Sequence, residues 1–245
     1  MDIACKHVSH AFDSLPVLQD LSADIPSGQF TALIGTSGCG KSTFLRILAG
    51  LLSPSGGTVT LGGQPPERAL AAKRVGFLSQ NPALLPWKTV LQNVMLAQRI
   101  NPQNHRDLHS SETLLEMVGL TDFAAAYPFT LSGGMQQRVA LARTLALGAD
   151  LWLMDEPFAA LDELTRERLG AELLTLWTRF HPTVVWVTHH IYEAVRLADR
   201  VLVLSPRPAR LQADIPIPLP RPRDEASSDF QARVRAIRTA LEAGG

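Results

Sequence analysis

A glycine-rich segment, GTSGCGKST at residues 35–43, constrains the fold more than any other part of the chain. It follows the apolar run FTALIG, which predicts a strand at residues 30–35, and it leads into a helical stretch at residues 41–51. The segment matches G-x-x-x-x-G-K-[ST], a loop whose backbone N–H groups surround phosphate at a helix N-terminus. An ordinary glycine-rich turn is disfavoured by the strand before it and the helix after it. The pattern therefore predicts an α/β fold built around a phosphate site.

The residue types in this segment suit phosphate and magnesium. Its glycines let the backbone bend so that N–H groups point inward, and Lys41 is placed to reach the terminal phosphates. The Ser42 hydroxyl is placed to bind Mg²⁺, and Thr43 to contact an inner phosphate. The predicted phosphate-binding residues are Gly35, Thr36, Ser37, Gly38, Cys39, Gly40, Lys41, Ser42 and Thr43.

Short apolar runs alternate with helical stretches along much of the chain. Two of these runs, at residues 151–154 and 183–187, are apolar on both faces, which is typical of a parallel sheet covered by helices. The further predicted strands are residues 74–80, 151–157, 183–189 and 200–205, and the further predicted helices are residues 162–179 and 190–198.

Three other regions depart from this alternation. An antiparallel sheet is predicted near the N-terminus from residues 3–12, 18–28 and 56–63. Residues 81–147 carry only helical patterns, which predicts an inserted helical subdomain between core segments 1–80 and 148–205. Residues 206–245 begin with a proline-rich stretch, which excludes helix and central strand, and end in a short amphipathic helix at about 227–241. We expect all these parts to form one domain, 1–245.

The bulk composition excludes several classes of protein. The chain has 23 Lys+Arg and 23 Asp+Glu, so it lacks the basic excess typical of a nucleic-acid binder. Cys5 and Cys39 are far apart and show no metal or disulfide pattern, which fits a reducing cytosol. The N-terminus has no secretory signal, and apolar runs such as FLRILAGLL are too short to span a membrane.

Two adjacent carboxylates, Asp155 and Glu156, end the apolar run LWLMDE. Ligands meet parallel sheets at the carboxyl ends of strands. Asp155 would hold Mg²⁺, directly or through water, and Glu156 would polarise an attacking water. The alternative is a strand that meets a solvated loop, and the phosphate loop elsewhere in the chain favours the catalytic interpretation.

Three more residues suit a nucleotide site, although each has an ordinary structural explanation. Gln80 ends a predicted strand, where its amide would touch both Mg²⁺ and the attacking water or simply cap the strand. His189 ends another strand, where it would hydrogen-bond a γ-phosphate or lie on the surface beside His190. Phe12 would stack on adenine or pack in the core. Neither histidine has neighbouring metal ligands, so we expect no metal role for them.

These elements together resemble the ATP-binding cassette (ABC) ATPases over most of residues 1–205. The motifs occur in the family's order, and LSGGMQQ at residues 131–137, followed by LWLMDEP at residues 151–157, is highly specific. The resemblance implies a RecA-like P-loop NTPase core with the antiparallel and helical subdomains described above. It also implies ATP and Mg²⁺ as cofactors, with Ser42, Gln80 and Asp155 at the metal.

The resemblance further implies an ATP-dependent, head-to-tail homodimer. In it, each ATP lies between the phosphate loop of one protomer, residues 35–43, and the partner's signature segment, residues 131–137. The glycines of that segment allow close backbone approach at a helix N-terminus, where the dipole faces an anion. Glu156 is implied to be the catalytic base, with His189 as γ-phosphate sensor and Gln80 as the link to a membrane partner. The implied contacts across the dimer come from Ser132, Gly133, Gly134, Gln136 and Asp162.

Two positions depart from the family pattern. The family often has serine where this chain has Ala159 or Ala160, which is common variation. In the family, the histidine that matches His189 is usually followed by aspartate. Here it is followed by His190, which changes the local charge.

Residues 81–97 and 204–223 resemble importers of nitrate, sulfonate and taurine, a branch that includes carriers of pyrimidine vitamin precursors. The implied partners are separate integral-membrane permease subunits and, indirectly, a solute-binding protein, with no nucleic acid. The implied location is peripheral, at the cytoplasmic face of the inner membrane. ATP binding would close the dimer, and the region Gln80–Trp87 would pass the motion to a permease helix; Leu84 and Trp87 are docking candidates that core packing explains equally well.

Two other functions stay open from the sequence. One is a soluble ABC ATPase that remodels a cytosolic complex. The other is a regulatory cassette that binds ATP and barely hydrolyses it, which the intact Lys41, Asp155, Glu156 and His189 disfavour.

Overall fold

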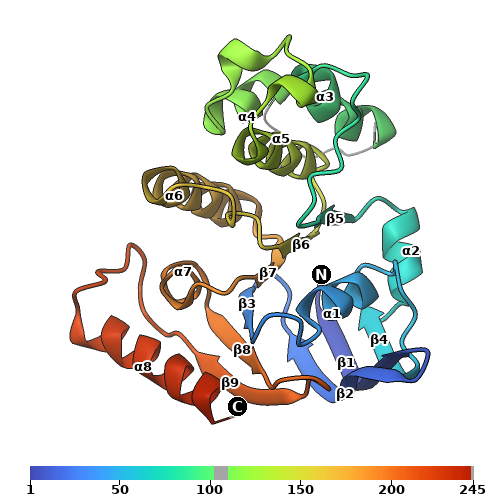
Figure 1. Ribbon diagram of the computed structural model, residues 1–245, viewed down its shortest axis with the longest axis vertical. Coiled ribbons are helices and arrows are strands. Elements are labelled where there is room, and N and C mark those ends of the chain that lie inside the picture. The colour runs from blue at the N-terminus through green and yellow to red at the C-terminus, as the bar shows by residue number, and fades with distance from the viewer. Residues whose placement is uncertain (102–109, 244–245) are drawn as a thin grey trace. The chain divides into compact units, whose positions relative to one another are not determined.

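The computed structural model describes residues 1–101 and 110–243. The chain forms two compact units: unit 1 comprises Met1–Ala72 and Pro182–Gly245, and unit 2 comprises Lys73–His181. Strands and helices alternate through both, which confirms the predicted α/β class (Figure 1). Within the described ranges, no helix has both the length and the apolar character needed to cross a bilayer.

Unit 1 contains the predicted N-terminal antiparallel sheet. Its strands are β1 (Ile3–Phe12), β2 (Leu15–Ile25) and β4 (Gly56–Leu61), in the order β2–β1–β4, with both neighbours antiparallel to β1. Buried residues on β1 and β2 are interspersed with exposed ones, as expected for a sheet with one face toward a core.

A second group of strands in unit 1 has the order β7–β3–β8–β9, with β3 parallel to both β7 and β8. Every residue of β7 is buried, which agrees with the prediction of a strand covered on both faces, and every residue of β3 is buried as well. The elements are β3 (Phe30–Ile34), β7 (Thr183–Val187), β8 (Arg200–Leu204) and β9 (Leu211–Pro216), with helices α1 (Lys41–Leu48), α2 (Pro66–Ala71) and α7 (Ile191–Leu197). Helix α2 was not predicted, although proline in the first turn is a common start signal.

The C-terminal part of unit 1 holds one predicted and one unpredicted element. Strand β9 lies within the proline-rich stretch and pairs antiparallel with β8. It is an edge strand, the position where a sheet tolerates proline, so the exclusion of a central strand holds. The predicted C-terminal helix is α8 (Ser228–Glu242), which buries Phe230, Val234 and Ile237 and packs on α7, β8 and β9 (Figure 1).

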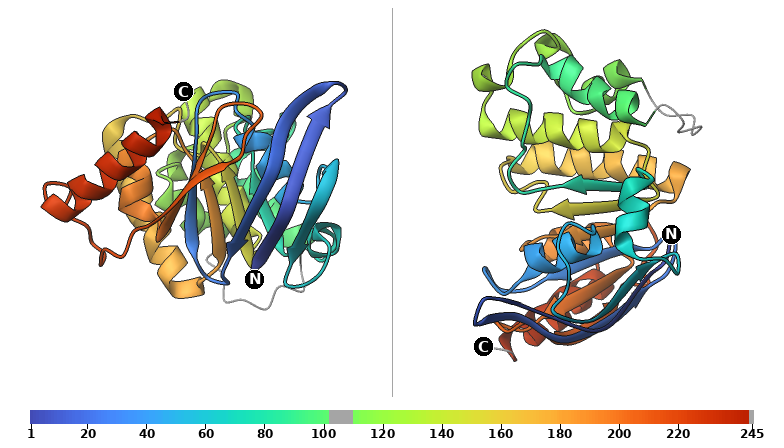
Figure 2. Two further views of the ribbon diagram at one scale, coloured as in Figure 1. Left: turned by 90° about the horizontal axis from the view of Figure 1, so that it is seen from below. Right: turned by 90° about the vertical axis from the view of Figure 1, so that its right-hand side faces the viewer.

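Unit 2 combines two parallel strands with a helical region. The strands are β5 (Val75–Leu78) and β6 (Leu151–Asp155). Helices α3, α4 and α5 pack together, as the green part of Figure 2 shows. The helices are α3 (Val90–Ile100), α4 (Ser111–Met117), α5 (Gly133–Ala146) and α6 (Glu163–Phe180), with 3₁₀ turns at Thr121–Phe123 and Pro128–Thr130.

The described part of the predicted helical insert, residues 81–101 and 110–147, contains α3, α4 and α5 and no strand. Unit 2 is larger than that insert because it also includes β5, β6 and α6. The division of the chain into the predicted subdomains stays a prediction. Residues 102–109 of the insert lie outside the described residues.

Candidate functional site

The glycine-rich segment lies in unit 1 between β3 and α1, as predicted. Lys41 begins α1 and is only 6% exposed. Its Nζ donates hydrogen bonds to the carbonyl oxygens of Gly35, at 2.8 Å, and Thr36, at 2.9 Å. The ammonium group is thus held inside the loop, beside a helix that has no side-chain cap and no acidic residue in its first turn. Free N–H groups, a helix dipole and a lysine together suit a phosphate anion.

The backbone of this loop requires glycine at two positions. Gly38 has φ of 71° and Gly40 has φ of 126°, both in the region that side chains rarely adopt. A Cβ on Gly40 would also lie 2.9 Å from the Cδ2 of Leu18. The loop therefore turns sharply into α1, so that the helix N-terminus follows directly.

Cys39 is a buried residue of the loop and has no sequence signal for reactivity. Burial is the main cause that raises the pKa of its thiol, and the nearby Lys41 ammonium opposes that effect. Cys5 is also free and buried, and its pKa is raised to about 12 by burial. Burial thus disfavours the thiolate form of both cysteines, the form that binds metals and exchanges disulfides.

His189 follows β7, which is the direct neighbour of β3, the strand that leads into the glycine-rich loop. Strands β3 and β7 are parallel neighbours with Leu33 opposite Val187, and two residues further along each chain stand Gly35 and His189. His189 is exposed, and its ring lies against the ring of His190 in a tilted arrangement, with ring centroids 4.2 Å apart and an interplanar angle of 38°. The structure thus brings His189 to the same strand ends as the phosphate loop.

Phe12 is exposed at the end of β1. The ring is 45% exposed and meets His10 edge to face, with centroids 4.7 Å apart. A side chain with this exposure is not packed in the core, which was the structural alternative for Phe12. Its role in stacking on adenine stays a prediction.

Unit 2 brings together Gln80, Asp155 and Glu156. Strands β5 and β6 are parallel, with Leu78 opposite Met154, so the chains continue past this pair toward Gln80 and Glu156. Asp155 ends β6 and is 3% exposed, whereas Gln80 is exposed. An amide and two carboxylates at neighbouring strand ends suit a magnesium ion and a polarised water.

Glu156 has a backbone conformation that sequence reasoning did not anticipate. Its φ is 49°, in the left-handed region that non-glycine residues rarely adopt. Such conformations persist where the surrounding structure fixes them, and they concentrate at functional sites. The regular strand geometry therefore ends at the buried Asp155, directly before Glu156.

The signature segment begins helix α5. Ser132 is the N-cap and its Oγ accepts a hydrogen bond from the Met135 N–H at 3.3 Å. Gln136 donates from Nε2 to the carbonyls of Pro128 and Leu131, so its side chain also braces the turn before the helix. Ser132 and Gly133 are both exposed. The start of the helix is therefore exposed.

The two glycines of the signature have different surroundings. A Cβ on Gly133 would meet nothing within 4 Å, whereas one on Gly134 would lie 2.8 Å from the Ala160 carbonyl oxygen. Gly134 therefore lets α5 approach the backbone of the segment that leads into α6. This second purpose of the paired glycines was not predicted.

Asp162 is the N-cap of α6. It accepts hydrogen bonds from the Thr165 N–H, at 2.9 Å, and the Thr165 hydroxyl, at 2.8 Å. These bonds are the main cause that lowers the pKa of the Asp162 carboxyl, with a smaller contribution from Arg138 on α5. Besides its predicted contact across a dimer, Asp162 thus has a structural role that the Asp-x-x-Thr spacing signals.

Unit 2 exposes Trp87 and a group of aromatic rings at residues 123–129. Trp87 is 70% exposed, which removes core packing as its explanation. The residue Leu84 is only partly exposed. Backbone hydrogen bonds from Val90 and Leu91 tie the segment after Trp87 to residues 124–126. The exposed rings at residues 123–129 are those of Phe123, Tyr127 and Phe129, and the sequence did not predict their exposure.

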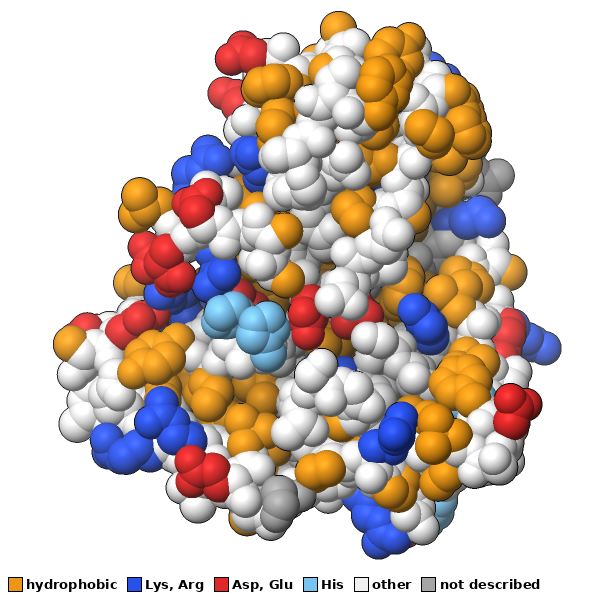
Figure 3. All heavy atoms as spheres, viewed as in Figure 1, with side chains coloured by type: hydrophobic (Ala, Val, Ile, Leu, Met, Phe, Trp, Pro, Cys, Tyr) orange, Lys and Arg blue, Asp and Glu red, His pale blue; other side chains and the backbone are white. Residues whose placement is uncertain are grey.

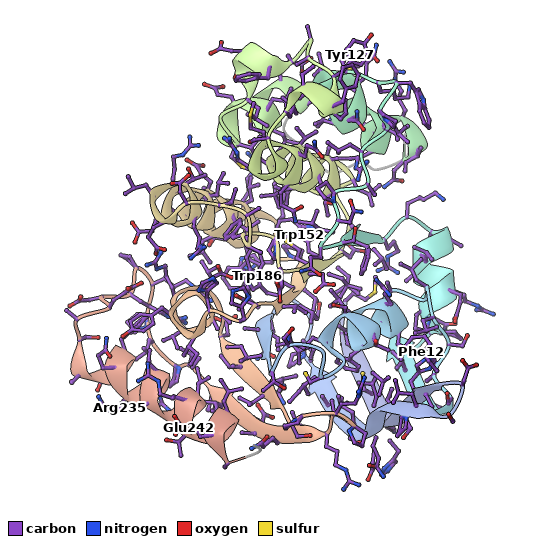
Figure 4. All side chains as sticks on the ribbon, in the orientation of Figure 1. Phe12, Tyr127, Trp152, Trp186, Arg235 and Glu242 are labelled. Atoms are coloured by element: carbon purple, nitrogen blue, oxygen red, sulfur yellow. The ribbon has the colours of Figure 1, made fainter. Side chains whose placement is uncertain are left out.

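A hollow in unit 2 lies beside this segment. It has a volume of about 220 Å³ and is lined by β5, α3 and α5, with Phe77, Leu96 and Ile100 as apolar members. Arg143, also in the lining, donates hydrogen bonds to the carbonyls of Pro82 and Ala83. Hydrophobic side chains gather over the helices of unit 2 on the face in Figure 3, and Tyr127 lies at the outer end of the unit in Figure 4.

A family model described as ABC transporter matches residues 18–159. The chain belongs to the ABC transporter family. The cassette is an ATP-binding and ATP-hydrolysing protein, as predicted. Its fold and the identity of its family are both confirmed.

Curated relatives cover most of the cassette. A putative ATP-binding protein of Brucella abortus biovar 1 is 45% identical over 239 residues, which are 94% of this chain and 89% of the relative. A taurine import ATP-binding protein of Rhizobium johnstonii is 46% identical over 80% of this chain and 74% of the relative. A nitrate import ATP-binding protein of Synechocystis is 42% identical over 82% of this chain and 76% of the relative.

Solved structures similar to the cassette include dimers. One is an ATP-binding cassette in a post-hydrolysis state with ADP and Pi, with a TM-score of 0.78, 30% identity and coverage of 88% of this chain and 98% of that one. Another is a dimeric bacterial ABC transporter cassette with a TM-score of 0.79 and the same identity and coverage.

The surroundings of the two signature glycines give a first prediction. Gly134→Ala should lower the free energy of unfolding by about 1–3 kcal/mol, because its methyl group would press on a backbone oxygen that cannot rotate away. Gly133→Ala is the matched control, since its methyl group meets open space and a glycine-to-alanine change in a helix costs no stability, or gains about 0.4–1 kcal/mol. Urea denaturation of each variant measures both values. Equal destabilisation by the two changes would contradict the packing role of Gly134.

Proposed function

We propose that the cassette is the ATP-hydrolysing subunit of an importer for a small sulfonate, nitrate or a related solute. The observation that carries this proposal is the 41–46% identity to subunits named for the import of taurine, aliphatic sulfonates and nitrate. The cassette itself would not touch the solute, because a solute-binding protein and a permease would carry it. ATP binding would close a head-to-tail dimer, and hydrolysis would open it.

The proposed roles in the reaction follow the predicted residues. The loop from Gly35 to Thr43 holds the phosphates, with Lys41 at the terminal ones, and Glu156 polarises the attacking water. His189 senses the γ-phosphate, and Phe12 stacks on adenine. The partner copy contributes Ser132, Gly133, Gly134, Gln136 and Asp162. Each protomer therefore carries one half of each of two ATP sites, and no ATP site is complete without the partner copy.

The oxygen donors of the chain suit Mg²⁺. Asp155 supplies a buried carboxylate, Ser42 a hydroxyl in the first turn of α1, and Gln80 an amide oxygen. Such hard oxygen ligands are those that Mg²⁺ prefers when it also binds substrate phosphates. When bound, the ion would neutralise charge on the phosphate oxygens.

The proposed docking surface for the permease lies on unit 2. It consists of the exposed Trp87 and the hollow lined by Phe77, Leu96 and Ile100. Arg143 connects the two, since it lines the hollow and holds the carbonyls of Pro82 and Ala83. An apolar hollow with an aromatic side chain beside it suits an amphipathic helix. The proposed location of the cassette, at the cytoplasmic face of the inner membrane, follows from the proposed permease partner.

Capture of the tagged cassette from solubilised membranes tests the proposal. We expect a polytopic membrane protein to be recovered with the wild type and lost with Trp87→Ala, because an exposed aromatic anchor carries much of such an interface. Leu164→Ala is the matched control, since Leu164 is 78% exposed on α6. Recovery of only water-soluble partners would favour the alternative, an ATPase that remodels a cytosolic complex.

A further inference from the structure

Helix α7 directly follows the residue proposed to sense the γ-phosphate. It contains only seven residues, Ile191–Leu197, and its N-cap is His190, next to His189. A helix this short is unstable by itself, and its last carbonyls have no intrahelical donors. The position of His189 therefore depends on what holds α7 in place.

The strand side of α7 is held through Glu193. Its Oε1 accepts a hydrogen bond from the Trp186 indole N–H at 2.5 Å, and both side chains are buried. Trp186 belongs to β7, the strand that leads to His189. Near the same end, the His190 N–H donates to the Thr188 hydroxyl at 3.0 Å. These bonds fix α7 against the parallel strands of unit 1.

The other end of α7 is held by Arg223, which lies in the proline-rich segment. Its Nη1 donates to the carbonyl oxygens of Val195 and Ala198, the latter at 2.7 Å. The same guanidinium donates to Ile217 and Leu219 in its own segment, at 3.2 and 3.1 Å. One planar group thus joins the C-terminal end of α7 to residues 217–219.

Arg221 and Glu225 reinforce this connection. Arg221 donates to the Leu197 carbonyl and forms an ion pair with Asp199 at 2.7 Å. Glu225 accepts a hydrogen bond from Arg196, in the last turn of α7. Cations near a helix C-terminus interact favourably with its dipole. Three side chains of one segment therefore contact the last turn of a seven-residue helix and the residues that follow it.

Arg221 lies close enough to Arg223 to disfavour the charge of the Arg223 guanidinium. Burial is the main cause that lowers the pKa of Arg223 to about 10, and Arg221 lowers it further, while Asp199 opposes both. Arg223 is still charged at neutral pH. A charged group that is partly buried and makes four hydrogen bonds to carbonyls is fixed in one arrangement.

Helix α8 packs against the first turn of α7. The Tyr192 ring lies against the buried Phe230, with centroids 5.8 Å apart, and its hydroxyl is 3.4 Å from the Gln231 side chain. Contacts to the C-terminal segment thus occur at both ends of α7.

We propose that Arg223, with Arg221 and Glu225, is a positioning residue for ATP hydrolysis: it fixes helix α7 and thereby the place of His189. The inference rests on the proposed role of His189. It assigns a positioning role to residues 217–231, which lie outside the sequence motifs of the nucleotide site. Phosphate binding at the loop beside α1 should be independent of them.

Steady-state kinetics of the full-length cassette tests the inference with Arg223→Gln and Arg221→Gln/Arg223→Gln. We expect kcat to fall about five- to tenfold, within the loss that a small misplacement of a reacting group causes. The KM for ATP and the affinity for a fluorescent ATP analogue should stay unchanged, because Lys41 and its loop are intact. Arg235→Gln is the matched control, since Arg235 is exposed on the outer side of α8 (Figure 4).

Two further readouts distinguish positioning from general stability. Arg223→Lys should restore part of kcat, because an ammonium reaches some of the carbonyls but not all four. The NMR resonances of the His189 ring, assigned with His189→Gln, should shift in Arg223→Gln and not in Arg235→Gln. Unchanged kcat and unchanged His189 resonances in the arginine variants would overturn the inference.

A milder variant covers the case in which loss of Arg223 unfolds the protein. Glu225→Gln removes only a charge from a side chain that is 35% exposed, so the fold should survive. It should lower kcat about twofold without changing KM, in proportion to the weaker contact that it removes. Unchanged kcat here, with Arg223→Gln unfolded, would also overturn the inference.

His189→Ala separates this inference from the proposed function. If His189→Ala hydrolyses ATP normally, the proposed role of His189 is wrong, and the inference that rests on it is wrong too. If His189→Ala abolishes hydrolysis while the arginine variants keep the wild-type kcat, only the inference fails.

Discussion

Glu156→Gln should keep ATP binding and lower the rate of ATP hydrolysis by about 10²–10⁴-fold, the contribution of a positioned general base. Glutamine has the shape of glutamate but cannot take a proton from the attacking water. Glu156 follows the buried Asp155 and has a left-handed backbone conformation with φ of 49°. This conformation fixes the direction in which the Glu156 side chain leaves the backbone. Because uncleaved ATP would hold the dimer closed, an ATP-dependent dimer should accumulate on size exclusion.

The matched control for this change is Glu163→Gln. Glu163 lies in the first turn of α6 and its side chain is 67% exposed, so hydrolysis should proceed at the wild-type rate. The ATPase rate is the firmer readout, because a permease would contribute to dimer stability. A Glu156→Gln variant that stays monomeric and hydrolyses ATP normally would contradict the assignment of the base.

The sequence carries most of the information on the fold, because its strands and helices have strong local patterns. Strands β3 and β7 are continuous apolar runs, and the structure buries every residue in them. Strand β9 was missed, since proline hides the signal of a strand that survives only at an edge. Helix α2 was missed because six residues are too few to show a period.

The site shows a similar division between local motifs and long-range contacts. The phosphate loop and the signature are contiguous segments, so their residue types alone indicate their chemistry. Gly134 lies against the Ala160 carbonyl, although the two residues are far apart in sequence. A periodic pattern of residue types contains no information about such a contact. The same is true of Arg223, whose acceptors on α7 lie 25–28 residues earlier in the chain.

Exposure is the other property that the sequence left open. For Phe12 and Trp87, both a core role and a surface role were consistent with the residue type. The structure exposes 45% of Phe12 and 70% of Trp87, which removes the core explanation for both. Aromatic residues are common in both places, so composition by itself could not decide between them.

Lys41→Met should lower the affinity for ATP by about 10²-fold or more, the order of loss when one partner of a buried charged contact is removed. Methionine keeps the length of the side chain and removes its charge. Nζ donates to the Gly35 and Thr36 carbonyls, so the ammonium is held within the loop before any phosphate arrives. A pre-positioned charge costs little ordering entropy on binding, and its loss should therefore affect affinity directly. Titration with a fluorescent ATP analogue measures the change.

Two comparisons decide whether the loss comes from the charge or from a collapsed loop. Lys6→Met is the matched control, since Lys6 is exposed on β1 and its charge should not matter for ATP. Ser42→Ala leaves Lys41 in place, so it should keep ATP affinity in the absence of Mg²⁺ and lose only the added affinity that Mg²⁺ gives. If Lys41→Met binds ATP as tightly as Lys6→Met, the ammonium only closes its own loop. The phosphate would then be held by the N–H groups at the start of α1 alone.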